Sequence, residues 1–324
     1  MSLSETLTAT GQSKPRGSPS PVGDRVLHAL TFGAAVLVLV VLGGVFVSLV
    51  QGSWLALSTF GASFLTTQSW NPATDVFGAA APVYGTLLTS ALALLIAVPV
   101  GLGISIFLTE LCPAWLARPI AIAIELLAGI PSIIYGIWGL FVLAPFLQKY
   151  FQPGVIALFH NIPGLNKLFA GPPYGIGVFT AALILSIMIL PFISSVTRDV
   201  FETVPPVLKE AAYGLGCTTW EVVRRVVIPH TRAGVIGAIM LALGRALGET
   251  MAVTFVIGNA QKISASILAP GTTISATIAN EFTEATGDIY TSSLIALGLI
   301  LFIVTFIVLA LARWMLHRME KQGR

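Results

Sequence analysis

The sequence predicts an all-α membrane protein with six transmembrane helices. Of its 324 residues, 56% are hydrophobic and only 10% are charged, whereas about 25% of residues are charged in an average soluble domain. Six apolar runs also reach the roughly 20 residues that a helix needs to cross a bilayer. These runs fall at residues 26–50, 84–108, 120–147, 175–196, 233–257 and 289–311.

The lysines and arginines outside the apolar runs predict the orientation, because cytoplasmic loops carry an excess of them. Those on the expected cytoplasmic side are Lys14, Arg16, Arg25, Arg118, Arg198, Lys209, Arg224, Arg225, Arg232, Arg313, Arg318, Lys321 and Arg324. Only Lys149, Lys167 and Lys262 fall on the opposite side. We therefore expect both termini, and the segment 198–232, to be cytoplasmic.

The chain divides into a tail and one membrane domain. Residues 1–24 are rich in Ser, Thr, Pro and Gly and are expected to form a disordered cytoplasmic tail. Residues 25–324 are expected to form a single transmembrane domain, because short loops join the spans. Cys112 and Cys217 both fall on the cytoplasmic side, where a disulfide is not expected. Neither stands near another Cys or a His at metal-ligand spacing, so no metal site is predicted.

Three outer segments differ in character. Residues 52–82 contain Trp54 and Trp70, which is consistent with a segment at the membrane interface. Repeated prolines and glycines in residues 148–174 argue against a long helix and predict an ordered, turn-rich loop. Residues 258–288 are expected to form short helices at the outer surface, where a periplasmic partner could dock.

The charged segment between the fourth and fifth runs predicts a helix, a glycine turn and a second helix. Prolines at 205–206 suit a helix start, and Gly214 and Gly216 are expected to end that helix. The sequence T-T-W-E at 218–221 offers a capping box for a second helix, which is expected to end before Pro229.

The spacing within this segment is recognisable. It reads Glu210-Ala211-Ala212, three residues, Gly216, nine residues, Val226, one residue, and Ile228-Pro229. This pattern resembles the EAA loop of ABC-transporter permeases. The resemblance implies a loop, here 198–232, that docks on an ATPase through Glu210, Ala211, Ala212, Gly216 and Pro229. The alternatives are a plain connector and a DNA-reading helix-turn-helix, which the closely flanking spans disfavour.

Two charged residues lie inside the fifth run. Arg245 and Glu249 are four residues apart, so a continuous helix would place them on one face. An arginine facing lipid at mid-membrane costs roughly 2.5 to 3.5 kcal/mol, so this face should meet protein or water. Gly237, Gly244 and Gly248 follow the same stripe and permit close helix approach. The pair is either a structural ion pair or part of a translocation path. In the path, Arg245 contacts an oxyanion and Glu249 is its resting counter-ion.

A third charged residue within an apolar run is Glu125, just before the sequence AGIPSIIYG. Pro131 and Gly136 are expected to kink this helix or to free backbone groups. Glu125 is either a capped or snorkelling carboxylate near the inner surface or a proton carrier.

Three stretches in order carry a closer resemblance. AGIPSIIYGIWGLFVL, GRALGETMAVTFVIGN and LAPGTTISATIANEF, with the EAA loop between the first and second, resemble the PstC family of phosphate-transport permeases. The resemblance implies the MetI-like fold of a type I ABC importer permease in the bacterial inner membrane. It further implies a second permease subunit (PstA-like), two ATPase subunits (PstB-like) and a periplasmic phosphate-binding protein (PstS-like) as partners.

The chain has no P-loop of the G-x4-G-K-[ST] type. We therefore expect no catalytic residue and no cofactor in it, since ATP and Mg would bind to the partner ATPase. Nucleic acid is not an expected partner, because the positive residues follow the topology. One alternative is import of another oxyanion, molybdate or sulfate. A second alternative is a proton-coupled secondary transporter that uses Glu125 and Glu249.

Overall fold

The computed structural model describes residues 21–322, and in this range the chain is helical apart from loops and one isolated bridge between Asn71 and Val76. Six helical stretches there are long and apolar enough to cross a membrane, namely Gly23–Phe60, Ala80–Leu111, Ser132–Phe159, Val178–Glu202, Thr219–Gly248 and Asp288–Arg318. The predicted all-α class with six spans is confirmed.

The helical elements include one 3₁₀ turn, η1, and four π turns, η2 to η5, in which hydrogen bonds span five residues instead of four. In chain order the elements are α1 (Pro21–Phe60), α2 (Ser63–Thr66), η1 (Pro72–Thr74), α3 (Ala80–Ile106), η2 (Phe107–Leu111), α4 (Ala114–Ala128), α5 (Ser132–Trp138), η3 (Gly139–Leu143), α6 (Ala144–Phe146), η4 (Leu147–Phe151), α7 (Gln152–Phe159), α8 (Leu165–Leu168), α9 (Val178–Glu202), α10 (Pro206–Gly214), α11 (Thr219–Val222), η5 (Val223–Val227), α12 (Ile228–Gly248), α13 (Met251–Val256), α14 (Ile274–Glu281) and α15 (Asp288–Gln322).

The chain separates into two compact units, the first ending at Ser48 and the second starting at Leu49. The first unit contributes the greater part of α1, whose apolar side chains are exposed around the helix. A helix that is apolar on all sides is suited to a membrane. Of the predicted tail, residues 1–20 lie outside the described residues, and residues 21–24 belong to the first turn of α1.

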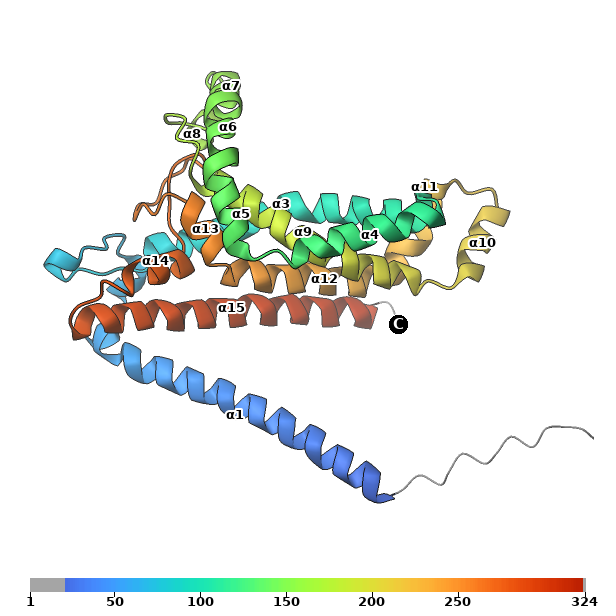
Figure 1. Ribbon diagram of the computed structural model, residues 1–324, viewed down its shortest axis with the longest axis horizontal. Helices are drawn as coiled ribbons and strands as arrows, with labels where there is room; N and C mark the ends of the chain where they lie inside the picture. The colour runs from blue at the N-terminus through green and yellow to red at the C-terminus, as the bar shows by residue number, and fades with distance from the viewer. Residues whose placement is uncertain (1–20, 323–324) are drawn as a thin grey trace, which may run out of the picture. The chain divides into compact units, whose positions relative to one another are not determined.

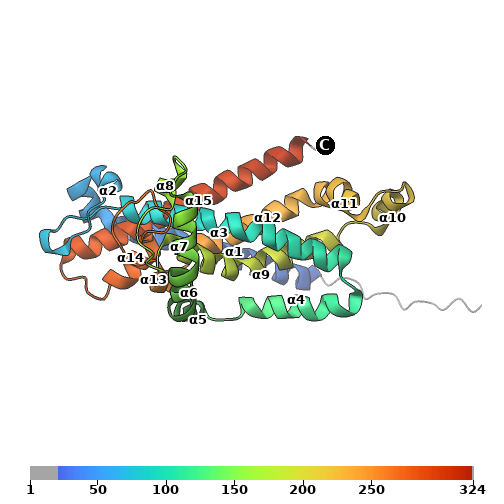
Figure 2. The ribbon, with the colours of Figure 1, turned by 90° about the horizontal axis from the view of Figure 1, so that it is seen from above.

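The second unit is built around α3, α9 and α12, which run side by side along one direction together with α15 (Figures 1 and 2). Small residues allow α3 and α9 to approach closely. A Cβ on Gly101 would meet the Ile193 side chain at 2.8 Å, and the Ser105 hydroxyl donates to the Ser194 carbonyl at 2.9 Å. The helices α10 and α11 lie at one end of this bundle, and α13 and α14 lie at the other (Figure 1).

The close approach of α3 to the segment before α14 makes a testable prediction. A Cβ on Gly85 would lie 1.8 Å from the Thr272 backbone oxygen, whereas a Cβ on Gly103, in the same helix, would meet nothing within 4 Å. We expect Gly85→Ala to destabilise the chain by about 1–3 kcal/mol, because overpacking forces the backbone apart. Thermal unfolding of the purified complex should show a lower Tm for Gly85→Ala than for Gly103→Ala. Equal Tm values would contradict this packing.

The predicted third span, residues 120–147, is not a single helix, and the interruption expected at Pro131 is confirmed. The chain breaks between α4 and α5, and Pro131 precedes the first residue of α5. Proline cannot donate to the preceding turn, and the Tyr135 hydroxyl instead donates to the Leu127 carbonyl across the break at 2.8 Å. In both views α4 follows the direction of α9, while the helix from α5 to α7 runs across it (Figures 1 and 2). Gly136 does not kink the helix, but its missing side chain lets α13 approach, since a Cβ there would lie 3.0 Å from the Ala252 Cα.

Each of the four π turns begins six residues before a proline. The pairs are η2 with Pro113, η3 with Pro145, η4 with Pro153 and η5 with Pro229. A π turn leaves one carbonyl without its usual partner, so the missing proline N–H costs little there, and the wider turn relieves the clash of the ring. Two predictions are therefore wrong: the helix that starts after Thr218 continues through Pro229 into α12, and residues 148–159 are helical through Pro153.

The outer segments are only partly as predicted. In the first of them Trp54 is exposed, whereas Trp70 is buried within the chain, because its ring contacts Phe77 and Tyr290 at centroid distances of 5.0 and 6.3 Å. Within residues 258–288 the structure has the predicted helix at α14 but none at 263–268. That stretch instead bonds to the end of α8, where the Ile267 N–H donates to the Leu168 carbonyl at 2.9 Å.

Candidate functional site

The segment 198–232 has the predicted local structure up to its last turn. Helix α10 ends at Gly214, and Gly216 follows with φ +85°, a backbone conformation that favours glycine. The Gly216 N–H donates to the Tyr213 carbonyl at 2.9 Å, and the next N–H, of Cys217, donates to Ala212 at 3.1 Å. Thr218 and Glu221 then form the predicted capping box at the start of α11.

The predicted coupling residues divide into an anchored and an exposed set. Ala212 is buried against Phe201 and Val222, while Glu210, Ala211, Gly216 and Pro229 are exposed. A side chain with a similar anchoring role is Lys209, whose ammonium lies 2.5 Å from the buried Glu110 carboxylate in η2. One side of α10 is thus fixed to the bundle, and the other is free.

Exposed apolar side chains next to these residues were not singled out from the sequence. Leu215 is 85% exposed and Trp220 is 62% exposed, and Val207 at the start of α10 is 71% exposed. Large apolar side chains gathered at one exposed end of a molecule are typical of an interaction surface. Their signal in the sequence is weak, because each also fits the apolar face of an amphipathic helix.

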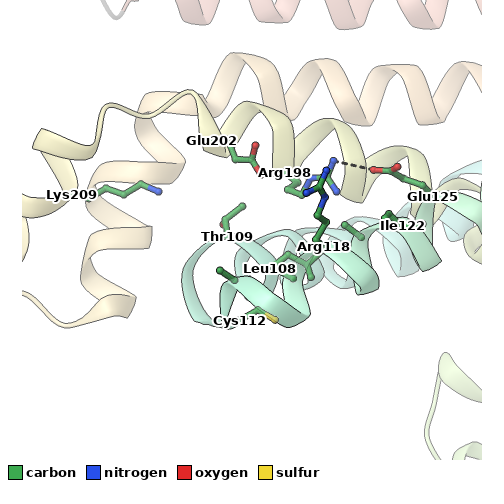
Figure 3. A pocket seen from close by; sticks show the side chains of 12 residues that line it. Leu108, Thr109, Cys112, Arg118, Ile122, Glu125, Arg198, Glu202 and Lys209 are labelled. Carbon is green, nitrogen blue, oxygen red and sulfur yellow. Dashed lines mark hydrogen bonds and ion pairs between the residues drawn. The ribbon is translucent and has the colours of Figure 1, made fainter.

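A cavity of about 620 Å³ lies between this segment and α4 (Figure 3). Arg198 points into it and pairs with Glu125 at 3.0 Å and with Asp199 at 2.9 Å. Arg118 and Glu202 also line the cavity. Glu125 is therefore a half-exposed member of an ion-pair cluster that joins α4 to α9, which extends the snorkelling interpretation of this carboxylate.

The predicted pair in the fifth run lies at the end of a helix and forms no ion pair. Helix α12 ends at Gly248, and its C-cap Glu249 has φ −70° and ψ 129°, so the chain leaves the helical path only after Glu249. The Glu249 carboxylate accepts weakly from the N–H of Ala252 at 3.5 Å. Within residues 21–322 no ion pair joins Arg245 to Glu249. The physical reason is that the chain turns from α12 into α13, which packs against α5.

Arg245 and Glu249 nevertheless line one cavity of about 1040 Å³ between α12 and α15. The three glycines of the predicted stripe line it as well, so their placement is confirmed. Most other lining side chains are apolar, and one further cation, Arg313, was not singled out from the sequence. The lining residues are Phe192, Gly237, Met240, Leu241, Gly244, Arg245, Gly248, Glu249, Phe306, Leu309, Ala310, Arg313 and Leu316.

The Arg245 guanidinium is only partly satisfied. Its Nε is buried and has no hydrogen-bond partner, and its central carbon lies 4.8 Å from the centroid of the Phe192 ring. A guanidinium in an apolar cavity with free donors favours an anion with several oxygens, which accepts bidentate hydrogen bonds. Among the described residues no group of three or more His, Cys, Asp or Glu side chains could hold a metal ion.

The class of protein is a membrane permease. It has six helices suited to cross a membrane, an exposed helical loop at one end, and an apolar cavity in which the Nε of an arginine has no partner. The family of binding-protein-dependent transport system inner membrane components matches residues 99–321. The phosphate transport system permease protein PstC of Mesorhizobium japonicum is 73% identical over 92% of this chain and 91% of the relative. The protein of the same name from Haemophilus influenzae is 56% identical over 89% of this chain and 91% of the relative. The chain therefore belongs to the PstC family of transport permeases.

A solved structure supports the fold alone. A chain of a bacterial alginate ABC transporter, in complex with a pentasaccharide-bound periplasmic protein, matches with a TM-score of 0.61 at 18% identity. The match covers 91% of this chain and 95% of that one. The MetI-like fold of an ABC importer permease, implied by the sequence, is thereby confirmed.

Proposed function

We propose that this chain is the phosphate permease subunit of an ATP-driven importer and forms half of its translocation path. Phosphate is assigned as the substrate because the chain is 73% identical to a phosphate transport permease over nearly its whole length. The Arg245 guanidinium, with its unpartnered Nε in an apolar cavity, supplies a group suited to an oxyanion. Family membership favours this function over a proton-coupled secondary transporter.

Labelled phosphate uptake into vesicles tests this function. The chain would be reconstituted with a second permease (PstA-like), two ATPase subunits (PstB-like) and a phosphate-binding protein (PstS-like). We expect uptake that requires ATP and the binding protein. Excess sulfate or molybdate should not compete. Competition by either anion at equal concentration would favour the alternative oxyanion, and uptake driven by a proton gradient without ATP would contradict the class.

The coupling of ATP hydrolysis to transport is assigned to the exposed side of α10 and the turn after it. We propose that Glu210, Ala211, Gly216 and Pro229 contact the ATPase. Ala212, on the buried side of α10, packs against the bundle and anchors this helix. The exposed apolar residues Leu215 and Trp220 support docking at this end. ATP and Mg are expected to bind to the ATPase subunits, and we expect no catalytic residue in this chain.

The proposed orientation places both termini and the 198–232 loop in the cytoplasm. Lys149 and Arg224 are both exposed in the folded chain, so a cysteine at either position reports the side of the membrane and not burial. In a background lacking Cys112 and Cys217, a membrane-impermeant thiol reagent added to spheroplasts should label Lys149→Cys. It should leave Arg224→Cys unlabelled until the membrane is permeabilised. The reverse pattern would invert the topology.

A further inference from the structure

The cavity between α12 and α15 contains a second arginine that the proposed path has not used. Its charged lining residues are Arg245, Glu249 and Arg313, so two guanidinium groups share one cavity with a single carboxylate. Among the side chains that the structure describes, residues 23–318, neither arginine takes part in an ion pair. The buried Nε of Arg245 has no partner and Arg313 is exposed, so an anion in the cavity would meet guanidinium donors at both positions.

The helix register gives the position of Arg313 along the cavity. A Cβ on Gly244 would contact the Leu309 side chain at 3.8 Å, which places Arg245 at about the level of Leu309. The helices α12 and α15 run in opposite directions, and α15 ends toward α10 and α11 (Figure 1). Arg313 follows Leu309 by four residues, about 6 Å along a helix. Arg313 therefore lies about one turn closer than Arg245 to the end of the molecule that carries α10.

We propose that Arg313 forms a second oxyanion contact on the translocation path, one helical turn beyond Arg245 toward the 198–232 loop. This inference rests on the proposed function. An anion that leaves Arg245 in this direction next meets mostly apolar side chains, such as Leu241 and Leu316. A second guanidinium at this level lowers the barrier out of the first contact. Conduction requires several weak sites in place of one strong site.

A simpler role for Arg313 would be to keep the end of α15 in the cytoplasm, as positive residues after a last span do. Arg318 provides a matched control, because it lies on the same helix and carries the same charge. Arg318 stacks on Trp314, with 3.8 Å between its central carbon and the ring centroid, and does not line the cavity. If charge alone matters, the two positions should respond alike to substitution.

The test compares Arg313→Gln, Arg313→Lys and Arg318→Gln in the complete reconstituted complex. We expect Arg313→Gln to lower the maximal phosphate uptake rate about tenfold, which corresponds to about 1.4 kcal/mol in the barrier. ATP hydrolysis stimulated by the binding protein should persist. Arg313→Lys should fall between Arg313→Gln and the unmodified complex, since lysine keeps the charge but not the planar fork. Arg318→Gln should transport normally.

A second measurement tests whether Arg313 contributes positive electrostatic potential to the cavity, and it does not depend on transport. In a chain without Cys112 and Cys217, a cysteine at the exposed cavity residue Ala310 would react with an anionic and with a cationic thiol reagent. We expect Arg313→Gln to lower the ratio of anionic to cationic rates severalfold, and Arg318→Gln to leave it unchanged.

Three results would overturn the inference: normal uptake in Arg313→Gln, equal losses in Arg313→Gln and Arg318→Gln, or a reduced amount of assembled complex in Arg313→Gln. The last would make Arg313 an interface residue that pairs with a partner subunit. Arg245→Met separates this inference from the proposed function. If that variant loses uptake while Arg313→Gln does not, only the second contact fails; if neither loses it, the assignment of the cavity fails.

Discussion

The double variant Arg245→Met with Glu249→Leu is expected to assemble normally and to hydrolyse ATP, yet to import almost no phosphate. Both substitutions remove a charge and keep approximate volume. Hydrogen bonds to a charged group contribute about 1.5 to 3 kcal/mol each, so losing them during transit corresponds to roughly a tenfold to hundredfold lower rate. Uptake of labelled phosphate, measured beside ATP hydrolysis in the same vesicles, checks the expectation.

The control for this variant is a cavity residue without charge. Leu241 lines the same cavity and is exposed, so Leu241→Met should import phosphate at nearly the unmodified rate. Import near that rate in the double variant as well would show that the two charges only support the fold. That outcome would be surprising, because no ion pair joins them in the described residues and the carboxylate lies beyond the end of α12.

Gly216→Val is expected to abolish the stimulation of ATP hydrolysis by the phosphate-binding protein. Gly216 has φ +85°, and a non-glycine residue in this region costs about 1–2 kcal/mol, more for a β-branched side chain. Valine would therefore change the backbone conformation of the turn after α10 and displace Leu215 and Glu210, which lie on the proposed docking surface. Stimulated hydrolysis and phosphate uptake, measured in the assembled complex, should fall together.

Gly214→Val is the matched control for this substitution. A Cβ at either glycine would meet nothing within 4 Å, so the two variants add the same side chain to equally open space. Gly214 is helical, and valine is at least as favourable as glycine there. Gly214→Val should retain stimulated hydrolysis. If both variants retained it, the conformation of the turn would be irrelevant to coupling, and the docking assignment would fail.

Local sequence signals predicted the 198–232 segment well. Gly214, Gly216 and the capping box at 218–221 act through contacts within a few residues, which a sequence pattern can record. The number of spans was equally predictable, because lipid imposes a minimum length on each apolar run. The grouping of Arg245 with three glycines was also correct, since the glycines lie on the same helix as the arginine.

The break in the third run was located at Pro131, but the break in the fifth run could not be located in the same way. The run 233–257 continues past Glu249 with only Thr250 and Thr254 as polar residues, so composition gives no reason for α12 to end at Gly248. The break depends on α13 packing against α5, where Gly136 leaves room for Ala252. The burial of Trp70 could not be predicted for the same reason, because it requires contact with Tyr290, which lies 220 residues away in the chain. Arg313 was counted among the cytoplasmic cations, because only the register of α12 against α15 places it in the cavity.

The π turn η5 sets the phase of the helix that carries Arg245. Helix α12 follows α11 without interruption, so the direction in which Arg245 points depends on the number of residues between it and the capped start at Thr218. A π turn holds one residue more than a regular turn needs, and each residue of an α-helix rotates the face by about 100°. Removing a single residue from 223–227 would leave the loop and the span each intact but turn Arg245 away from α15. A deletion of one apolar residue between the two proposed sites would thus disconnect them.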